Sequence, residues 1–355
     1  MPVKKKHRVA VAMSGGVDST LTAYLLQREG YEVLGLTMRL WDTGQETLAP
    51  FIANARVAAA KMGFEHRVID LRTEFSACVT QFFMNSYLAG ETPSPCVRCN
   101  RLIKFGALAD AARGAGCEAL ATGHYVRVQR EDGRWLVRRA LDPAKDQSYF
   151  LFDLSQEQLA FAKFPMADRL KEDVKILADK LGLVPKEKDE SQDLCFIPDG
   201  DYVGYITRQR PDIGEPGKIV AVDGQVLGEH QGFFKYTIGQ RRGLGLGGGP
   251  WYVTALDAET NTVMVGSKDD VLSDTVFIRD VNWLREPLAA GDELEVALQV
   301  RFSMRPVPAV VSMGAAGRAT AAAKRPVSAV TPGQAAVFYR GDCVIGGGWI
   351  TGTDE

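Results

Sequence analysis

The stretch RVAVAMSGGVDS, residues 8–19, decides how the first part of this chain folds. Arg8–Met13 is an apolar run of strand length, and Ser14-Gly15-Gly16 follows it as a turn before a helix-like segment. Glycines let the backbone turn sharply and pass close to a ligand. Free N–H groups and the dipole at a helix start attract anions. The stretch therefore predicts a strand, a phosphate-binding loop and a helix.

The predicted loop is not a Walker A loop, because no GxxxxGKS or GxxxxGKT pattern occurs in the chain and no lysine follows the glycines. Asp18 is the only acid in the loop, and it is a candidate ligand for Mg²⁺ that bridges phosphates. We interpret residues 14–19 as a pyrophosphatase-type loop that binds ATP and activates an oxygen atom as an adenylate. The alternative is an ordinary tight turn between a strand and a helix.

Strand-like and helix-like segments alternate along the first half of the chain. The expected strands are Arg8–Met13, Tyr31–Met38, Phe64–Asp70 and Glu118–Thr122, and the expected helices include Asp18–Gly30, Leu48–Gly63, Thr73–Leu88 and Asn100–Gly114. This order predicts an α/β fold, a parallel sheet with helices on both faces.

The second half of the chain has a different texture. A charged run, Lys186–Gln192, predicts a loop or linker. Short β-rich runs separated by Gly and Pro then predict small barrels or sandwiches: Lys218–Val222, Trp251–Asp257, Thr262–Val265, Val276–Trp283, Glu293–Arg301, Ala309–Met313 and Ala335–Tyr339. We expect a catalytic domain at residues 1–205, a central β-rich domain at 206–275 and a barrel-like domain at 276–355.

Composition excludes several classes of protein. The 355 residues are 46% hydrophobic and 24% charged, which is ordinary for a globular protein. The formal net charge of −2 means that nucleic-acid binding must depend on local patches. No apolar run has the length of a membrane span or the features of a signal peptide. We expect a cytoplasmic protein with no membrane contact, and a monomer by default.

The six cysteines are not expected to form a disulfide framework in a reducing compartment. Three of them are interpreted as small core residues: Cys78, Cys117 and Cys343. Cys96 and Cys99 precede a helix, whose dipole favours thiolate together with the basic side chains of Arg98, Arg101 and Lys104. No second pair exists for a four-cysteine zinc site. A redox couple, half of a zinc site and a nucleophile with a partner all remain open. Cys195, taken alone, is expected to be buried.

Eight motifs occur in a fixed order: SGGVDS (14–19), TPSPCVRCN (92–100), ATGHY (121–125), KDQSYFL (145–151), LCFI (194–197), GEHQG (228–232), TIGQRRGLG (237–245) and TPGQ (331–334). With them the chain resembles the bacterial tRNA-specific 2-thiouridylases, a family of pyrophosphatase-loop tRNA sulfurtransferases, over nearly its whole length. The resemblance implies an adenine nucleotide alpha hydrolase-like fold and thiolation of the wobble uridine of tRNA.

The resemblance also implies a reaction. ATP adenylates the uracil carbonyl oxygen and releases pyrophosphate, after which persulfide sulfur from Cys195 replaces that oxygen and AMP leaves. Cys99 acts as nucleophile and can form a disulfide with Cys195. A cysteine desulfurase or a sulfur-relay protein supplies the sulfur. The chemistry is consistent, because nucleophilic sulfur needs an activated thiol or persulfide and the target base must leave its stack.

The family's binding positions carry over onto residues of this chain. Its ATP site falls on Ala12, Met13, Ser14, Gly15, Gly16, Val17, Asp18, Ser19, Met38 and Gly123. Its tRNA contacts fall on Ser94, Pro95 and Cys96 at the target base, and on His124, Lys145, Asp146, Gln147, Arg301, Phe302 and Gln334.

Cys96 departs from the best-described branch of the family, which has a general acid/base aspartate at this position. The departure opens a second mechanism, in which Cys96, Cys99 and Cys195 hold a 4Fe-4S cluster with one iron free to take sulfide. We place persulfide chemistry first.

The C-terminal region has a local excess of positive charge. No acidic residue lies between Glu295 and Asp342, while six basic residues do: Arg301, Arg305, Arg318, Lys324, Arg325 and Arg340. They predict a surface that follows RNA phosphates, and Phe302 adds a ring on which a base can stack. The alternative is a solvated face.

Two other functions compete with thiolation. An amide-forming or amidotransferring ligase would use the same loop, but it leaves the cysteines and the basic region unexplained. An RNA-binding protein with a degenerate nucleotide site is the non-enzymatic alternative, and the intact Asp18 and Ser19 oppose it.

Overall fold

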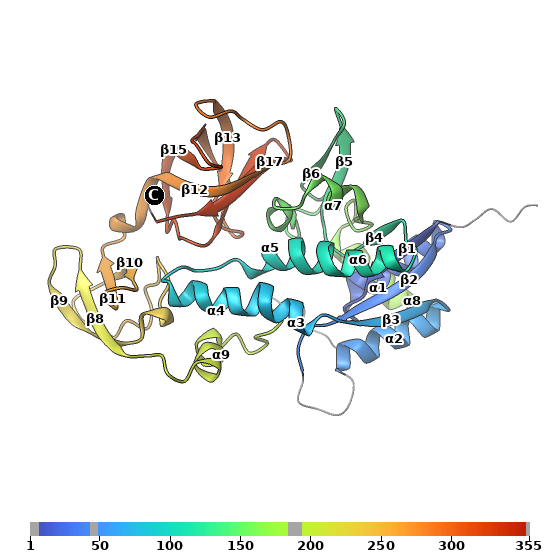
Figure 1. Cartoon of the computed structure of the whole chain (residues 1–355), viewed down its shortest axis with the longest axis horizontal. Helices are drawn as coiled ribbons and strands as arrows, with labels where there is room; N and C mark the ends of the chain where they lie inside the picture. The colour runs from blue at the N-terminus through green and yellow to red at the C-terminus, as the bar shows by residue number, and fades with distance from the viewer. Residues whose placement is uncertain (1–6, 43–48, 184–193, 353–355) are drawn as a thin grey trace, which may run out of the picture. The chain divides into compact units, whose positions relative to one another are not determined.

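The computed structural model of this chain describes residues 7–42, 49–183 and 194–352 (Figure 1). Residue contacts divide the chain into two units. Unit 1 comprises Met1–Thr80, Cys96–Glu190 and Asp342–Ile345, and unit 2 comprises Gln81–Pro95, Ser191–Gly341 and Gly346–Glu355. The run Lys186–Gln192, predicted to be a loop, lies outside the described residues. Within the described ranges, no helix combines the length and apolar character needed to cross a membrane.

A parallel sheet forms the centre of unit 1, in the order β3-β2-β1-β4-β7. Its strands are β1 (Arg8–Ala12), β2 (Glu32–Arg39), β3 (Glu65–Asp70), β4 (Ala119–Ala121) and β7 (Ala162–Lys163). Val9, Ala10 and Val11 of β1 are almost completely buried. A strand covered on both faces reads as a continuous apolar run, so the sequence pattern of β1 and its central position agree.

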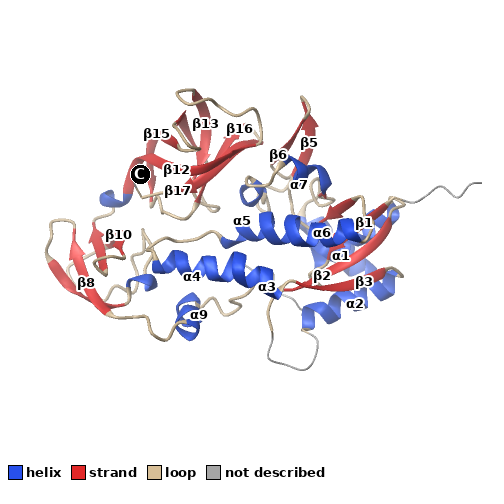
Figure 2. Cartoon of the chain, in the orientation of Figure 1, coloured by secondary structure: helices blue, strands red, loops and turns tan. Residues whose placement is uncertain are grey.

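Helices cover both faces of this sheet, as predicted (Figure 2). They include α1 (Val17–Arg28), α2 (Pro50–Met62), α6 (Leu108–Gly114) and α8 (Lys171–Leu181). Right-handed crossovers from β1 to β2 and on to β3 put α1 and α2 on one face, and the return to β4 on the other side of β1 puts α6 on the opposite face. The contacts agree: α1 touches α2 and α8, and α6 packs on β1, β2 and β4.

The helices expected at Thr73–Leu88 and Asn100–Gly114 are confirmed as helical segments, and each of them contains a π-helical stretch. The first is α3 (Arg72–Phe75), the π-helix η1 (Ser76–Thr80) and α4 (Gln81–Leu88). The second is preceded by α5 (Pro95–Cys99) and consists of the π-helix η2 (Asn100–Ala107) and α6. Gly106 interrupts η2 with non-helical dihedral angles. Wide turns of this kind occur often at functional sites.

Shorter elements complete unit 1 and the start of unit 2. They are β5 (Arg127–Glu131), β6 (Arg134–Arg138), η3 (Ser148–Leu151), α7 (Gln156–Phe161) and α9 (Tyr202–Gln209). The last four residues of the ATGHY motif and the KDQ segment lie in connections between elements.

Unit 2 contains two β-rich bodies, which confirms the predicted change of texture. The first is a four-stranded sheet, β10-β11-β8-β9, built from β8 (Pro216–Ala221), β9 (Val226–Gln231), β10 (Tyr252–Asp257) and β11 (Thr262–Gly266), with η4 (Phe233–Lys235) and η5 (Asp269–Val271) beside it. Ile219, Val253, Val263 and Val265 form its core.

The second β-rich body is a closed barrel. Its strands are β12 (Leu272–Trp283), β13 (Glu293–Gln299), β14 (Val307–Met313), β15 (Ala319–Ser328), β16 (Ala335–Arg340) and β17 (Cys343–Ile350). They follow the order β12-β15-β14-β13-β16-β17, and β17 pairs back onto β12. Closure leaves no free edge among these strands. The first residues of β17, Cys343 and Val344, belong to unit 1 and pair with β6.

Candidate functional site

The loop between β1 and α1 is held by the hydroxyl of Ser19. This Oγ accepts a hydrogen bond from the Ser14 backbone N–H (3.1 Å), lies 3.2 Å from the Ser14 Oγ, and donates to the Gly16 carbonyl (3.1 Å). Gly16 is the N-cap residue of α1, and it offers no side chain to the helix start. The first backbone N–H groups of a helix have no partner within it, so the start of α1 fits an anion.

Gly15 turns the loop in a conformation that other residues avoid. Its φ is +71°, and a Cβ atom at this position would lie 2.3 Å from the backbone oxygen of Phe51 in α2. Gly16 has neither restriction, because an added Cβ would meet only the Ser14 Oγ, at 3.5 Å.

We expect Gly15→Ala to lower the free energy of unfolding by about 2–5 kcal/mol, from the left-handed backbone and the overpacking together. Gly16→Ala is the matched control and should change stability by less than about 1 kcal/mol. Urea unfolding without nucleotide measures both. Equal losses in the two variants would contradict the assigned geometry.

The loops after β1 and β4 meet at the point where the strand order of the sheet reverses. A Cβ atom on Gly123, which follows β4, would lie 2.9 Å from the Cβ of Asp18 in the first loop. In open α/β sheets, ligands bind at the carboxyl ends of the strands at this switch point. The structure therefore brings together Gly123 and residues 14–19, which the sequence predicted for one site.

The remaining predicted ATP residues end the two central strands. Ala12 is the last residue of β1, and Met13, which follows it, is buried. Its backbone oxygen accepts a hydrogen bond from the Thr37 hydroxyl of β2 (2.8 Å). Met38 is partly exposed, at the carboxyl end of β2, beside β1 in the sheet.

Lys171 is the residue at this site that sequence reasoning missed. Its Nζ lies 2.7 Å from both carboxylate oxygens of Asp18, and the Tyr125 hydroxyl donates to the Asp18 Oδ1 (2.9 Å). The Lys171 side chain is only 10% exposed. One signal was present in the sequence: a lysine at the first position of a helix is unfavourable for the helix dipole, and Lys171 begins α8.

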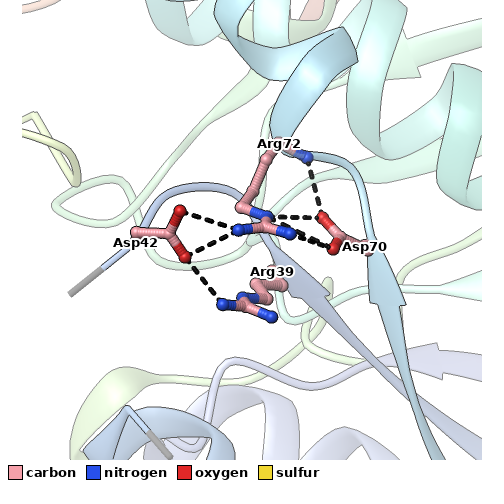
Figure 3. Close-up of polar contacts among 4 residues, drawn as sticks. All are labelled: Arg39, Asp42, Asp70 and Arg72. Atoms are coloured by element: carbon pink, nitrogen blue, oxygen red, sulfur yellow. Dashed lines mark hydrogen bonds and ion pairs between the residues drawn. The ribbon is translucent and has the colours of Figure 1, made fainter. Parts of the chain in front are cut away.

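An exposed ionic cluster holds the segment that follows Met38 (Figure 3). Arg72 donates to both oxygens of Asp42 (2.7 Å each) and to Asp70 (2.7 Å), and Arg39 donates to Asp42 (2.6 Å). Hydrogen bonds from Arg72 lower the pKa of Asp70 to about 2 and also lower the pKa of Asp42. The two positive and two negative charges cancel, so the cluster fits an anchor for the chain better than an anion site.

Cys96 and Cys99 lie in α5, and the basic residues near them are engaged elsewhere. The Arg98 Nε donates to the Cys78 carbonyl (2.7 Å), and Arg101 pairs with Asp153 (2.6 Å). Protein atoms crowd the Cys96 thiol and raise its pKa, an effect that Lys104 partly opposes, although the residue keeps solvent-exposed surface. The expectation that the surroundings favour thiolate was therefore wrong for Cys96. Cys99 is buried.

His124 lies among aromatic and basic side chains of unit 1. The Thr122 hydroxyl is 2.7 Å from its Nδ1, the Lys104 Nζ is 3.4 Å from its Nε2, and the rings of Phe105 and Phe164 are close. Desolvation and the Lys104 charge hold its pKa well below the usual value, although the residue keeps some exposed surface. A lysine ammonium only donates, so the geometry assigns the ring as neutral, with Nε2 as acceptor.

The KDQ segment, Lys145–Gln147, organises the loop around Tyr125. Asp146 is buried and accepts hydrogen bonds from Arg139 (2.8 Å), from the Ser148 hydroxyl (2.8 Å) and from the Ala140 N–H (3.0 Å). The Gln147 Oε1 accepts from the Tyr125 N–H (2.9 Å). Lys145 is partly exposed. The segment is thus connected through Tyr125 to Asp18.

In unit 2, Gln334 holds the segment that precedes α5, the helix with Cys96 and Cys99. Its Nε2 donates to the backbone oxygens of Thr92 (2.9 Å) and Pro93 (3.1 Å), and the Thr92 N–H donates to the Pro332 carbonyl (2.8 Å). Ser94 and Pro95, predicted at the target base, are buried next to this anchor.

Cys195 is exposed on a turn of unit 2, so the expectation of a buried residue was wrong. The Ile197 N–H donates to the Leu194 carbonyl (2.8 Å) and closes the turn. Beside Cys195, the Phe196 ring packs against Phe83 and Tyr205, with centroids 5.3 and 5.4 Å apart. The neighbours of Cys195 are therefore anchored, and Cys195 itself is exposed.

The basic residues of the barrel do not form one patch. Arg301, Phe302 and Arg305 are exposed in the connection between β13 and β14. Arg318 lies in the turn between β14 and β15, at the other end of β14. Lys324 pairs with Glu295 (2.6 Å). The prediction was based on the number of basic residues in one segment of sequence. In the structure, the antiparallel strands place Arg305 and Arg318 at opposite ends of β14.

Two further features of the described residues do not form a nucleotide site. A cavity of about 590 Å³ lies at the amino ends of β1 and β4, where His7 pairs with Glu118 and Arg127 with Asp168. It has no glycine loop and no helix start, so we place the site at the phosphate loop instead. Within the described ranges, no three His, Cys, Asp or Glu side chains are grouped as metal ligands.

Sequence models of known families match three parts of the chain. The tRNA methyl transferase HUP domain matches residues 7–199, the tRNA methyl transferase PRC-barrel domain 205–267, and the aminomethyltransferase beta-barrel domain 273–350. Among solved structures, the U34-tRNA thiolase NcsA from Methanococcus maripaludis with its 4Fe-4S cluster is 19% identical, with a TM-score of 0.36, over 59% of this chain and 68% of that chain. That likeness is too low to support an argument.

Curated relatives are far more similar. A tRNA-specific 2-thiouridylase MnmA from Geobacter metallireducens is 44% identical over 99% of this chain and 98% of the relative. One from Methylorubrum populi is 47% identical over 97% of this chain and 93% of the relative. With matches of this identity along nearly the full length, the chain belongs to the tRNA-specific 2-thiouridylase family.

Proposed function

We propose that this chain makes 2-thiouridine at the wobble position of tRNA by adenylating the uracil carbonyl oxygen and then replacing it with sulfur. Its family makes it a tRNA-uridine 2-sulfurtransferase that acts on tRNA. The observation that carries the adenylation step is the start of α1, which no side chain caps and which lies against Gly123 at the switch point of the sheet.

The residues around the loop fit ATP. Backbone N–H groups of residues 14–19 would hold the phosphates, the ends of β1 and β2 at Met13 and Met38 would border the base, and Gly123 leaves room beside the loop. Asp18 would hold Mg²⁺ once the cation displaces the ammonium of Lys171. Bound ATP supplies the adenylyl group, and pyrophosphate leaves.

The sulfur step is assigned to the thiols. Cys99 would act as nucleophile and Cys195 would carry the persulfide sulfur that a cysteine desulfurase or a sulfur-relay protein delivers. The outer persulfide sulfur on Cys195 would attack the activated uracil carbon and displace AMP. The Cys99 thiolate would then attack the Cys195 sulfur, so that the persulfide S–S bond breaks, the outer sulfur stays in the product and a disulfide between Cys99 and Cys195 forms. A 4Fe-4S cluster on Cys96, Cys99 and Cys195 is the alternative carrier.

The tRNA contacts are proposed for residues in both units: Ser94, Pro95, Cys96, His124, Lys145, Asp146, Gln147, Arg301, Phe302 and Gln334. The structure supports different roles within this set. Arg301 and Phe302 are exposed and fit direct contact with phosphate and base. Gln334 and Asp146 use their hydrogen bonds inside the protein, so we infer that they position the segments around them.

Labelled ATP and purified tRNA test the proposal. We expect pyrophosphate release to require tRNA with a wobble uridine, and 2-thiouridine to appear when a persulfide donor is added. Release that needs an amine acceptor and no tRNA would identify an amide-forming ligase instead. RNA binding without any release would leave only the non-enzymatic function.

Arg301→Ala with Arg305→Ala should weaken tRNA binding and reduce the slope of log affinity against log salt by roughly one for each lost phosphate contact. Arg318→Ala is the matched control, because Arg318 lies at the other end of β14. Filter binding across a salt series measures the slopes. If the double variant and the control both had the slope of the wild-type protein, both regions would be assigned to solvated surface.

A further inference from the structure

Lys171 occupies a position that the fold alone does not explain. Its side chain is 10% exposed at the first residue of α8, where the neighbouring acids Glu172 and Asp173 suit the helix dipole and a lysine does not. The Asp142 carboxylate already accepts a hydrogen bond from the Lys171 backbone N–H (3.0 Å) and so caps the helix. A buried ammonium is costly unless it is paired.

Two partners of the Lys171 side chain belong to the phosphate site. Its ammonium bridges both oxygens of Asp18 at 2.7 Å and lies 5.6 Å from the centre of the Tyr125 ring. Tyr125 in turn donates to Asp18 and is braced by Gln147. Asp18 lies in the first turn of α1, at the uncapped helix start. Three segments far apart in sequence therefore hold one ammonium beside the expected phosphate position.

We propose that Lys171 is a phosphate-contacting residue. Without nucleotide, its ammonium pairs with Asp18 at the position that Mg²⁺ would take when it binds together with the nucleotide. The inference rests on the proposed ATP site. Residues 14–19 include no lysine or arginine, so a basic side chain that stabilises the charge of the departing pyrophosphate has to come from elsewhere. Asp18 would hold Mg²⁺, which prefers carboxylate oxygen, and the ammonium of Lys171 would then be available to a phosphate oxygen. Lysine has a flexible stem with three donors, which allows Nζ to move from Asp18 to a phosphate oxygen without rebuilding α8.

A purely structural ion pair is the competing explanation, and the two make opposite predictions for paired variants. If Lys171 only neutralises Asp18, then adding Lys171→Met to Asp18→Asn should leave pyrophosphate affinity as it is in Asp18→Asn alone, because the charge to be neutralised is already gone. If Lys171 contacts phosphate, the double variant should bind pyrophosphate more weakly than Asp18→Asn alone.

Calorimetric titration of the full-length protein with pyrophosphate, with ATP and with adenosine, each with Mg²⁺, tests this. We expect Lys171→Met to weaken pyrophosphate and ATP binding by roughly 10- to 100-fold, the size of a charge-assisted hydrogen bond, and to leave adenosine binding unchanged. Lys171→Arg should recover part of the loss. Lys180→Met, an exposed lysine on the same helix, is the matched control.

Each result decides the question. Pyrophosphate affinity of Lys171→Met within about twofold of wild type would overturn the inference, and so would a double variant that binds pyrophosphate as tightly as Asp18→Asn alone. If Lys171→Met fails to fold, the comparison moves to Lys171→Arg and to the double variant, whose Asp18→Asn single variant serves as reference. Failure of the wild-type protein to bind ATP would overturn the proposed function itself, and the two failures are thus distinguishable.

Discussion

Asp18→Asn is expected to reduce tRNA-dependent pyrophosphate release by about 100-fold or more. A metal ion contributes several kcal/mol of charge stabilisation to a reaction of this kind, and each 1.36 kcal/mol corresponds to about a tenfold change in rate. An amide at this position still accepts a hydrogen bond from Tyr125 and Lys171 but loses the charge that attracts Mg²⁺. Asparagine is preferable to alanine, because alanine would leave the buried ammonium of Lys171 without an acceptor.

Quenched-flow measurement of released pyrophosphate tests this expectation, and filter binding should find tRNA affinity nearly unchanged. Asp110→Asn is the control, since Asp110 is exposed on α6 and pairs with Arg113. Retention of most of the release in Asp18→Asn would contradict the assignment of the loop.

Cys99→Ser and Cys195→Ser should each eliminate 2-thiouridine and still permit tRNA-dependent consumption of ATP. Adenylation precedes sulfur attack, so neither thiol is needed for the first step, whereas serine is too weak a nucleophile for the second. Mass spectrometry of digested tRNA measures the product, and Cys78→Ser is the matched control on a partly buried thiol outside the motif. Full thiolation by the Cys195 variant would refute the persulfide and cluster mechanisms together.

Cys96→Ser separates those two mechanisms. If sulfur travels as a persulfide on Cys195, this variant should be slower and still make the product, because a hydroxyl can hydrogen-bond near the base. If a 4Fe-4S cluster is required, loss of one of three ligands should abolish thiolation as completely as loss of Cys99. Near-normal thiolation in Cys96→Ser would exclude the cluster.

Some elements of the fold could not be predicted from the pattern of apolar residues and residue types in the sequence. The strand Ala319–Ser328 was not predicted, because its first half is mostly alanine, which is depleted in strands. It forms because β12 and β14 pair with it on both sides. The π-turns at Ser76–Thr80 and Asn100–Ala107 were missed for a related reason, since the apolar spacing there resembles that of an ordinary helix.

What the sequence by itself determined is local: the apolar strand Arg8–Ala12, the glycine turn after it and the start of α1 follow from steric and hydrogen-bonding preferences within a few residues. The ordered motifs then identified the family. Only the tertiary structure decided that Lys171 meets Asp18, and that Gln334 holds the segment before Cys96. These contacts join residues 153 and 242 positions apart. No local preference encodes them, because each exists only once its own unit has folded and brought distant segments within hydrogen-bonding distance.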